Sequence, residues 1–344
     1  MKKVWILSIF LLLAIVISFF LGVNLGYAKI PTSEVMEIIQ AKLNLGGSLE
    51  GIRASTVDIV TFIRLPRLIL AIIVGMSLAT SGVVMQAVVR NPLADPYILG
   101  ISSGAALGAT LAILFKLGQS IGPNFVGFSA FIMAFIVAIL VVFLANIGGR
   151  ATSTKLLLSG LALSTVASSF SSLLIYLSSN RDAARQVTFW LLGSLSGAKW
   201  EQIKFIGPII FLSAMFFWTQ YRTLNLMLLG DEVSITMGKD LNKSRHIYIL
   251  VASAMIGFVV YVSGVLGFVG LIVPHIARMI VGTDHKRLVP VSMLMGALLL
   301  LWADIISRII IPGAELPTGV IISVVGAPMF IYLIVSKSYG GKKR

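Results

Sequence analysis

Long apolar runs alternate with short polar stretches along the whole chain. A helix needs about 20 apolar residues to cross the roughly 30 Å hydrocarbon core of a bilayer. A shorter apolar run at residues 187–197 predicts a surface or re-entrant helix. The longer runs predict about ten membrane-spanning helices, near residues 4–26, 66–89, 98–117, 125–147, 156–178, 203–220, 246–264, 267–282, 290–311 and 318–335. We therefore expect an all-α integral membrane protein in which residues 1–344 form one transmembrane domain.

The composition supports this class. Hydrophobic residues make up 58% of the chain and charged residues only 12%, too few to supply the polar shell of a soluble protein. The formal net charge of +14 would suggest nucleic acid as a partner of a soluble protein. Here the 27 Lys and Arg residues fall largely in the connections, where anionic lipid accounts for most of them. We expect membrane lipid as a partner, and no nucleic acid.

The first 28 residues allow two interpretations. A basic start, an apolar run and the ending Gly26-Tyr27-Ala28 are typical of a cleaved signal peptide. The apolar run is near twenty residues, however, and is longer than the ~7–15 residues of a signal core. This length favours a retained first membrane helix.

The distribution of basic residues predicts the orientation of the chain. An even number of spans places both termini on one side, and a modest excess of Lys and Arg predicts the cytoplasmic side. The clearest basic segments of that side are the loop at 284–287 and the tail at 337–344. Arg64 and Arg67, in the stretch IRLPRLI, then lie on the external face, against the usual bias.

Asp304 is the one carboxylate predicted well inside a span. Such an acid is a candidate for proton relay. Arg308 follows four residues later on the same helix face, and a paired charge costs less in a membrane than a single one. We therefore favour a local ion pair between Asp304 and Arg308. A proton- or sodium-driven carrier and an intramembrane enzyme are the rival classes, but they need several intramembrane acids or paired polar catalysts.

Other chemistry has little support in the sequence. His246, His275 and His285 stand in no metal-ligand spacing, and the chain has no cysteine for disulfides or thiolate chemistry. The pair Gly238-Lys239 lacks the upstream glycine and the hydroxyl residue of a nucleotide-binding loop. We expect no catalytic residue, no metal and no cofactor, and an energy source outside this chain.

The loop LLGDEVSITMGKDLNKSR, between the sixth and seventh predicted spans, has an unusual pattern. Asp231 can cap a short helix whose face would carry Val233, Ile235 and Met237, and Gly238 can end it. One interpretation is a solvated connector. The other is a docking helix for a cytoplasmic partner, which the apolar residues favour.

Seven segments together resemble the permease subunits of ABC importers for iron-siderophores, haem and cobalamin. The similarity covers nearly the whole chain, and the segments occur in the same order and spacing. They are RLPR at 64–67, SGVVMQAVVRNPLADPYILGISSGA at 81–105, LLLSGLALS at 156–164, FWLLGSLSGAKW at 189–200, LGDEVSITMG at 229–238, GFVGLIVPHIARMIVG at 267–282 and AELPTGVIISVVGAPMFIYLI at 314–334.

The resemblance implies an architecture and a set of partners. Members of the family have ten helices per subunit with both termini cytoplasmic. Two permease subunits, identical or paralogous, enclose a central pathway, two cytoplasmic ATPase subunits bind beneath, and an extracytoplasmic substrate-binding protein delivers the cargo. We expect a non-enzymatic permease in a bacterial cytoplasmic membrane, with a ferric siderophore as the cargo. Haem or cobalamin is the alternative.

The resemblance also implies roles for individual residues. Arg64, Arg67 and Arg308 match arginines that face acidic residues of the binding protein. Ser153 and Thr154 match the loop at the cytoplasmic gate. The matching ATPase coupling loop comprises Leu229, Gly230, Asp231, Glu232, Val233, Ile235, Met237 and Gly238.

Overall fold

The computed structural model describes residues 2–26, 28–118, 124–149, 151–178 and 180–340, and this part of the chain forms helices and connections without a strand. The elements are α1 Lys2–Asn24, α2 Thr32–Lys42, α3 Ala54–Asp58, the π-helix η1 Ile59–Arg64, α4 Leu65–Val89, the 3-10 helix η2 Pro96–Leu99, α5 Ile101–Leu114, α6 Phe125–Asn146, α7 Ser153–Leu177, α8 Arg181–Leu191, α9 Trp200–Thr219, α10 Tyr221–Leu229, α11 Asp231–Thr236, α12 Asn242–Ser263, α13 Val269–Val281, α14 His285–Ile309 and α15 Thr318–Gly340.

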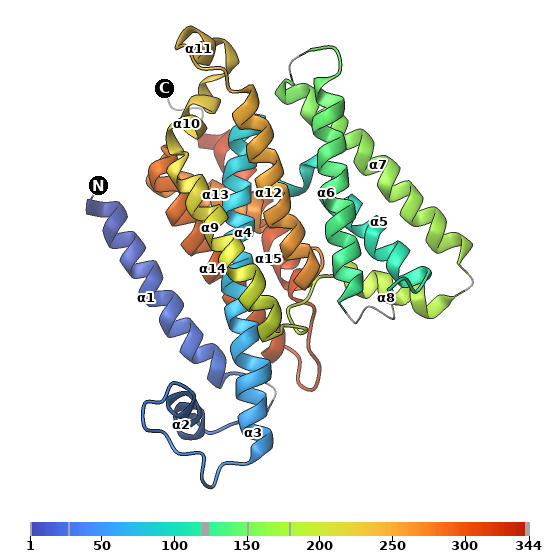
Figure 1. Ribbon diagram of the computed structural model, residues 1–344. Coiled ribbons are helices and arrows are strands. Elements are labelled where there is room, and N and C mark those ends of the chain that lie inside the picture. The colour runs from blue at the N-terminus through green and yellow to red at the C-terminus, as the bar shows by residue number, and fades with distance from the viewer. Residues whose placement is uncertain (1, 27, 119–123, 150, 179, 341–344) are drawn as a thin grey trace.

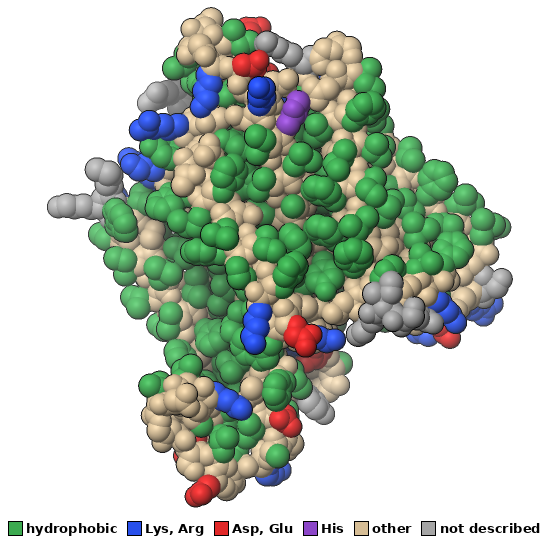
Figure 2. All heavy atoms as spheres, in the orientation of Figure 1, with side chains coloured by type: hydrophobic (Ala, Val, Ile, Leu, Met, Phe, Trp, Pro, Cys, Tyr) green, Lys and Arg blue, Asp and Glu red, His purple; other side chains and the backbone are tan. Residues whose placement is uncertain are grey.

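Ten of these elements coincide with the ten predicted apolar runs. In the described residues, α1, α4 with α3 and η1, α6, α7, α9, α12 and α14 are long and apolar enough to cross a membrane. Helices α5, α13 and α15 are shorter apolar helices. The space-filling view shows a broad band of hydrophobic side chains, with charged side chains gathered towards the ends (Figure 2). The prediction of an all-α integral membrane protein is confirmed.

Helix α4 forms the centre of the bundle. It packs against α9, α12, α13 and α14, and 20 of its 25 residues are buried. Helices α5, α6, α7 and α8 form a second group beside it, joined to the centre mainly by contact between α6 and α12 (Figure 1). The start of α1 and the end of α15 lie towards the end of the bundle that carries α11, as an even number of spans requires (Figure 1).

Close backbone approach positions α4 against its neighbours. A Cβ atom built on Gly75 would overlap the backbone of Gly296 in α14, and one built on Gly82 would overlap the carbonyl oxygen of Gly270 in α13. Small residues permit such approach between membrane helices, where dispersion contacts replace the hydrophobic effect as the source of association. Glycines therefore determine how closely α13 and α14 pack on α4.

The stretch RLPR is helical in spite of its proline. Pro66 stands in the first turn of α4 and has no N–H to donate to the carbonyl group of Phe62. The six residues before Leu65 wind as the π-helix η1, which accommodates the interruption and joins α3 to α4 without a bend into a loop. Arg64 and Arg67 are thereby carried on one continuous helical segment.

The short helix predicted at 187–197 lies further towards the N-terminus. Helix α8 begins at Arg181 because the Asn180 side chain accepts hydrogen bonds from the backbone N–H groups of Asp182 and Ala183, both at 3.1 Å. It ends at Leu191, just before Gly193 with a φ of +67°. The predicted apolar segment therefore contains only the second half of this helix.

We predict that Gly82→Ala and Gly75→Ala each lower the stability of the folded protein. Forcing a methyl group into these contacts should cost about 1–3 kcal/mol, because the obstacle is a backbone that cannot rotate away. Thermal unfolding of the purified protein in detergent measures this. Gly197→Ala is the matched control, since no atom lies within 4 Å of a Cβ atom at that position. Equal melting temperatures for all three variants would contradict the packing argument.

Candidate functional site

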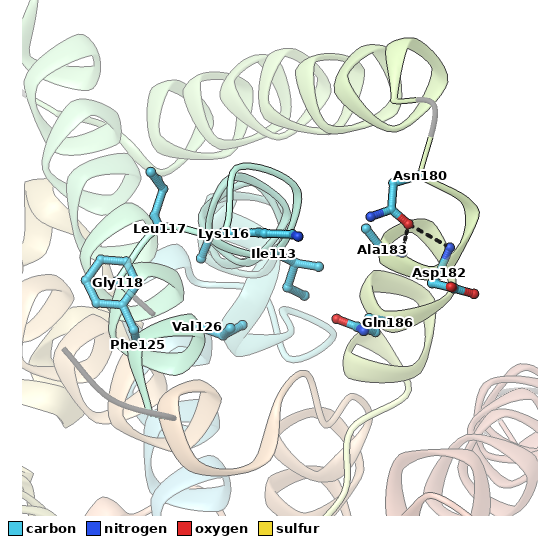
Figure 3. A pocket seen from close by; sticks show the side chains of 11 residues that line it. Ile113, Lys116, Leu117, Gly118, Phe125, Val126, Asn180, Asp182, Ala183 and Gln186 are labelled. Carbon is cyan, nitrogen blue, oxygen red and sulfur yellow. Dashed lines mark hydrogen bonds between the residues drawn. The ribbon is translucent and has the colours of Figure 1, made fainter. Parts of the chain in front are cut away.

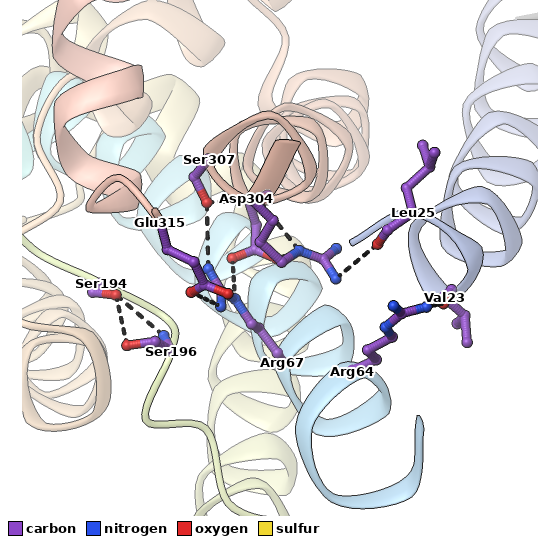
Figure 4. A network of polar contacts seen from close by, with 10 residues as sticks. Val23, Leu25, Arg64, Arg67, Ser194, Ser196, Asp304, Ser307 and Glu315 are labelled. Carbon is purple, nitrogen blue, oxygen red and sulfur yellow. Dashed lines mark hydrogen bonds and ion pairs between the residues drawn. The ribbon is translucent and has the colours of Figure 1, made fainter. Parts of the chain in front are cut away.

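Five charged residues gather at the end of the bundle opposite α11, where α1 ends, α4 begins and α14 ends (Figures 1 and 4). We call Arg64, Arg67, Asp304, Arg308 and Glu315 the arginine–acid cluster. The cluster contains three guanidinium groups and two carboxylates, so it keeps an excess positive charge. Arg64, Arg67, Asp304 and Arg308 are buried, and only Glu315 is open to solvent, with 44% of its side chain exposed.

Arg67 is the centre of the cluster. Its Nε donates to Asp304 Oδ1 at 2.6 Å, and its Nη1 donates to Glu315 Oε2, also at 2.6 Å. Its Nη2 donates to the hydroxyl group of Ser307 at 3.3 Å. With 2% of the side chain exposed, Arg67 has exchanged its hydration for these three protein contacts.

The other two arginines, Arg64 and Arg308, contact the end of α1. Arg64 donates to the backbone carbonyls of Val23 at 2.6 Å and of Asn24 at 3.1 Å, carbonyl groups that the end of a helix leaves without partners. Arg308 Nε lies 3.3 Å from Asp304 Oδ2, and its Nη1 donates to the carbonyl of Leu25 at 3.3 Å. Each arginine therefore ties α1 to a central helix (Figure 4).

The sequence places Arg64 and Arg67 on the external face, and the structure shows that both of them, and Arg308, are buried at that end of the bundle. The predicted ion pair between Asp304 and Arg308 is present at 3.3 Å, and Asp304 makes a second, shorter contact with Arg67, 237 residues away in sequence. Glu315 and Ser307 were not identified as partners. No local pattern could have found them, because the pairing depends on how α4 packs against α14.

At the opposite end of the bundle, α10 and α11 form the predicted coupling loop. Leu229 ends α10. Val233 and Ile235 of α11, and Met237 directly after it, are exposed, with 42–65% of each residue accessible. Gly238, with a φ of +76°, ends the helix: its N–H donates to Ile235 O and that of Lys239 donates to Ser234 O, both at 2.8 Å. An apolar surface on a short, well-ended helix suits a protein partner.

Asp231 does not cap α11, contrary to the prediction. Gly230 occupies the position before the helix, and the carboxylate of Asp231 instead accepts a hydrogen bond from Arg245 Nη2. Gly230 can take this place because its φ of +98° and ψ of 165° suit only glycine. Glu232 is exposed beside it.

Helix α10 is tied to the start of α14. Asn225 Nδ2 donates to Asp284 Oδ1 at 2.9 Å, and Asp284 also caps α14 by accepting from the backbone N–H of Lys286 at 3.1 Å. The hydrogen bond from Asn225 lowers the pKa of Asp284 below its ordinary value, and burial opposes the shift only in part. The base of the coupling loop is therefore anchored to the bundle.

The two predicted gate residues begin α7, close to this loop. Thr152 caps α7, Ser153 is buried and Thr154 is exposed. The hydroxyl group of Ser153 accepts a hydrogen bond from Arg90 Nε at 3.2 Å. The structure thus brings the predicted gate and the predicted coupling loop to the same end of the molecule.

Helix α7 carries a stripe of hydroxyl groups along its outer side. A shallow pocket of about 560 Å³ is lined by five residues that all have hydroxyl side chains, which we call the hydroxyl face: Ser164, Thr165, Ser168, Ser169 and Ser172. Four of the five are exposed, and the hydroxyl group of Ser168 lies 3.2 Å from that of Ser103 in α5. Thr165 donates to the carbonyl of Leu161 in its own helix at 3.0 Å, and lipid offers the other exposed hydroxyl groups no hydrogen bond, which favours protein or water opposite this face.

A second pocket, of about 500 Å³, lies where α5 ends, α6 begins and α8 begins (Figure 3). Lys116, Phe125 and Gln186 line it, together with Asn180, which caps α8. The pocket mixes apolar and polar groups without a cluster that could hold a metal. No group of three or more His, Cys, Asp or Glu residues with that geometry occurs anywhere among the described residues.

The fold and these sites define a class: a multi-pass membrane protein with a buried polar cluster at one end and an exposed apolar helix at the other. The chain belongs to the FecCD transport family, whose model matches residues 12–336. It is therefore the permease subunit of an ABC importer, a class in which permease subunits are paired and are not enzymes.

Known proteins similar to the chain include two well-covered relatives. The hemin transport system permease protein HmuU of Yersinia pestis is 40% identical over 79% of this chain and 82% of its own length. The iron(3+)-hydroxamate import system permease protein FhuG of Bacillus subtilis is 36% identical over 94% of each chain. Other relatives are described as permeases for cobalamin and for Fe(3+)-citrate.

A solved structure extends this similarity to the fold. It is described as an inward-facing conformation of a metal-chelate type ABC transporter and has 31% sequence identity to this chain. The two superpose with a TM-score of 0.82 over 96% of this chain and 98% of the other.

We predict that Asp304→Asn destabilises the protein far more than Glu315→Gln. The first change leaves the buried charges of Arg67 and Arg308 without their shared carboxylate, which should cost about 3–5 kcal/mol. The second removes a half-exposed partner and should cost about 1 kcal/mol or less. Chemical unfolding of both variants in detergent micelles compares the two costs, and equal losses would show that burial does not determine them.

Proposed function

We propose that this importer takes up iron(III)-siderophore complexes across the cytoplasmic membrane, driven by ATP. The family leaves several cargoes open, since its members include permeases described for hemin, cobalamin, Fe(3+)-citrate and iron(3+)-hydroxamate. We choose the ferric siderophore among these cargoes because of the hydroxyl face of α7. Ser and Thr side chains both donate and accept hydrogen bonds, so they suit the oxygen-rich surface of a ferric chelate.

The hydroxyl face also suggests where the cargo passes. Helix α7 is among the least buried of the long helices, so a second permease subunit facing it would turn the face into one wall of a central path. Neutral hydroxyl groups form hydrogen bonds that are individually weak and easily exchanged. A cargo can then move along the wall without being trapped at one position.

The remaining partners follow from the two ends of the molecule. The exposed apolar residues of α11 support docking to one of two cytoplasmic ATPase subunits, through the loop from Leu229 to Gly238. ATP binding and hydrolysis by the ATPase subunits would open the path alternately to the two sides of the membrane. Ser153 and Thr154, at the start of α7, would form the cytoplasmic gate.

An extracytoplasmic binding protein would dock on the arginine–acid cluster. Burial restricts how this can happen. Arg64 and Arg308 are occupied by carbonyl groups of the segment that ends α1, whereas Arg67, itself buried, contacts the half-exposed Glu315. We propose that an acidic residue of the binding protein replaces Glu315 as a partner of Arg67. Arg64 and Arg308 would then contribute mainly through the excess positive charge of the cluster.

Glu315→Gln should strengthen docking, because it removes the competing carboxylate and raises the positive charge of the cluster. We expect the dissociation constant for the binding protein to fall about three- to tenfold at low salt and the difference to shrink at high salt. Binding to the purified importer in nanodiscs measures this. Glu37→Gln, an equal charge change on the exposed side of α2, is the control. An unchanged or weaker affinity for Glu315→Gln would exclude the exchange.

The cargo is tested by uptake in cells. Deleting the gene under iron limitation should abolish uptake of radiolabelled ferric siderophore, and the gene supplied in trans should restore it. Parallel assays with haem and cobalamin provide the alternatives. Loss of haem or cobalamin uptake, with siderophore uptake unchanged, would replace the proposed cargo with that compound.

The role of the hydroxyl face is tested in the same cells. Ser168→Leu together with Ser172→Leu should reduce siderophore uptake at least tenfold, since leucine fills the pocket and removes two hydrogen-bonding groups. Ser168→Thr with Ser172→Thr keeps the hydroxyl groups and should retain most of the uptake. Normal uptake by the leucine variant, at matched expression, would remove this face from the path.

A further inference from the structure

Two arginines from different helices converge on one carboxylate at the coupling loop. Arg245, in the first turn of α12, donates to Asp231 Oδ1 through its Nη2. Arg90, the residue that ends α4, has its Nη2 3.8 Å from Asp231 Oδ2. Asp231 is the first residue of α11, so any displacement of this short helix acts on both arginines.

Each arginine also contacts the segment that begins α7. Arg245 Nη1 donates to the carbonyl of Ala151 at 2.7 Å, and Arg90 Nε donates to the hydroxyl of Ser153 at 3.2 Å. Two parallel bridges therefore run from α11 to residues 151–153. One of them is almost fully buried, since 3% of the Arg245 side chain is exposed, whereas 36% of Arg90 is exposed.

The surroundings of these bridges suit a contact that changes. A cavity of about 160 Å³ lies beside them, lined in part by Thr152, Asp231 and Arg245. Among the described residues, Arg245 Nε and Asn242 Oδ1 are buried without a hydrogen-bond partner. A buried guanidinium group that is only partly satisfied, next to free space, can exchange one set of partners for another at less cost than a group enclosed on all sides.

Backbone geometry positions the guanidinium group of Arg90 beside α11. Arg90, the residue after the last residue of α4, lies in the left-handed region with a φ of +56°. A Cβ atom on Gly230 would come within 2.8 Å of Arg90 Nη1, so the glycine before α11 makes room for the guanidinium group. The bridge through Arg90 therefore depends on unusual backbone conformations at Arg90 and at Gly230.

We propose that Asp231, Arg245 and Arg90 form a coupling latch that transmits the displacement of α11 to the start of α7. The proposal rests on the proposed function, in which α11 contacts the ATPase and Ser153 and Thr154 form the gate. The three residues are positioning residues: they contact neither the cargo nor the nucleotide. When the ATPase shifts α11, the two arginines pull on Ala151 and Ser153, and the gate moves with them.

The first test separates coupling from folding and from ATPase binding. Arg245→Gln, which breaks the buried bridge, and Arg90→Gln, which breaks the more exposed one, are introduced separately into the complete importer in proteoliposomes; both residues lie outside the docking loop. We expect the ATPase subunits to co-purify as before and ATP hydrolysis to stay within about twofold. Cargo moved per ATP hydrolysed should fall at least tenfold in Arg245→Gln and about threefold in Arg90→Gln. Lys243→Gln, an exposed charge in the same turn of α12, is the control.

The second test needs no cargo. The chain has no cysteine, so Thr154→Cys places a single thiol in this subunit at the predicted gate. Its rate of reaction with a thiol reagent should change several-fold when a non-hydrolysable ATP analogue binds, and Arg245→Gln should abolish that change. A change that persists in Arg245→Gln, or no change in the parent, overturns the latch. If labelling responds as expected but siderophore is not imported, the proposed cargo fails and the latch stands.

Discussion

The buried ion pair between Arg67 and Asp304 sets the arrangement of the central helices. Both side chains are almost fully buried, so neither charge can be stabilised by water, and each depends on the other. The pair fixes the rotation of α4 against α14 at one end, and the contact of Gly75 with Gly296 fixes their separation further along. Because α9, α12 and α13 pack on the same helix, an error in α4 would displace most of the bundle.

This constraint gives α4 a mechanical property. A straight helix of 25 residues spans about 37 Å, roughly the thickness of a membrane, and α4 carries Arg67 in its first turn and is followed directly by Arg90. A helix buried on nearly all sides, with glycine contacts to two neighbours, moves with its surroundings and does not bend alone. The two ends of the molecule are therefore joined by one rigid element that offers an arginine at each end.

The sequence predicts the membrane-spanning helices well because the signal is local. Twenty apolar residues have few alternatives in a bilayer, and the polar stretches between the apolar runs indicate where the helices end. The segment from Gly230 to Gly238 could be recognised for the same reason, since its exposed Val233, Ile235 and Met237 stand out from their polar neighbours.

Contacts between distant segments could not be predicted in this way. Arg64 and Arg67 look like surface charges because they flank an apolar run, and only the packing of α1 and α14 against α4 buries them. Asp231 resembles a helix cap by its position, yet its carboxylate accepts a hydrogen bond from Arg245 in the next helix. In each case a tertiary contact determines the surroundings of the side chain, and the local pattern does not contain it.

The two ends of α4 use the same device in different environments. At each end an arginine in or next to α4 shares an aspartate with a second arginine: Asp304 pairs with Arg67 and Arg308, and Asp231 pairs with Arg90 and Arg245. Asp304 is fully buried, whereas 32% of the Asp231 side chain is exposed. Burial makes the first arrangement costly to open, because every alternative leaves a charge without a partner. At the second, water can replace a lost partner, so opening costs much less. The same chemistry can therefore serve as an anchor at one end of the helix and as a movable contact at the other.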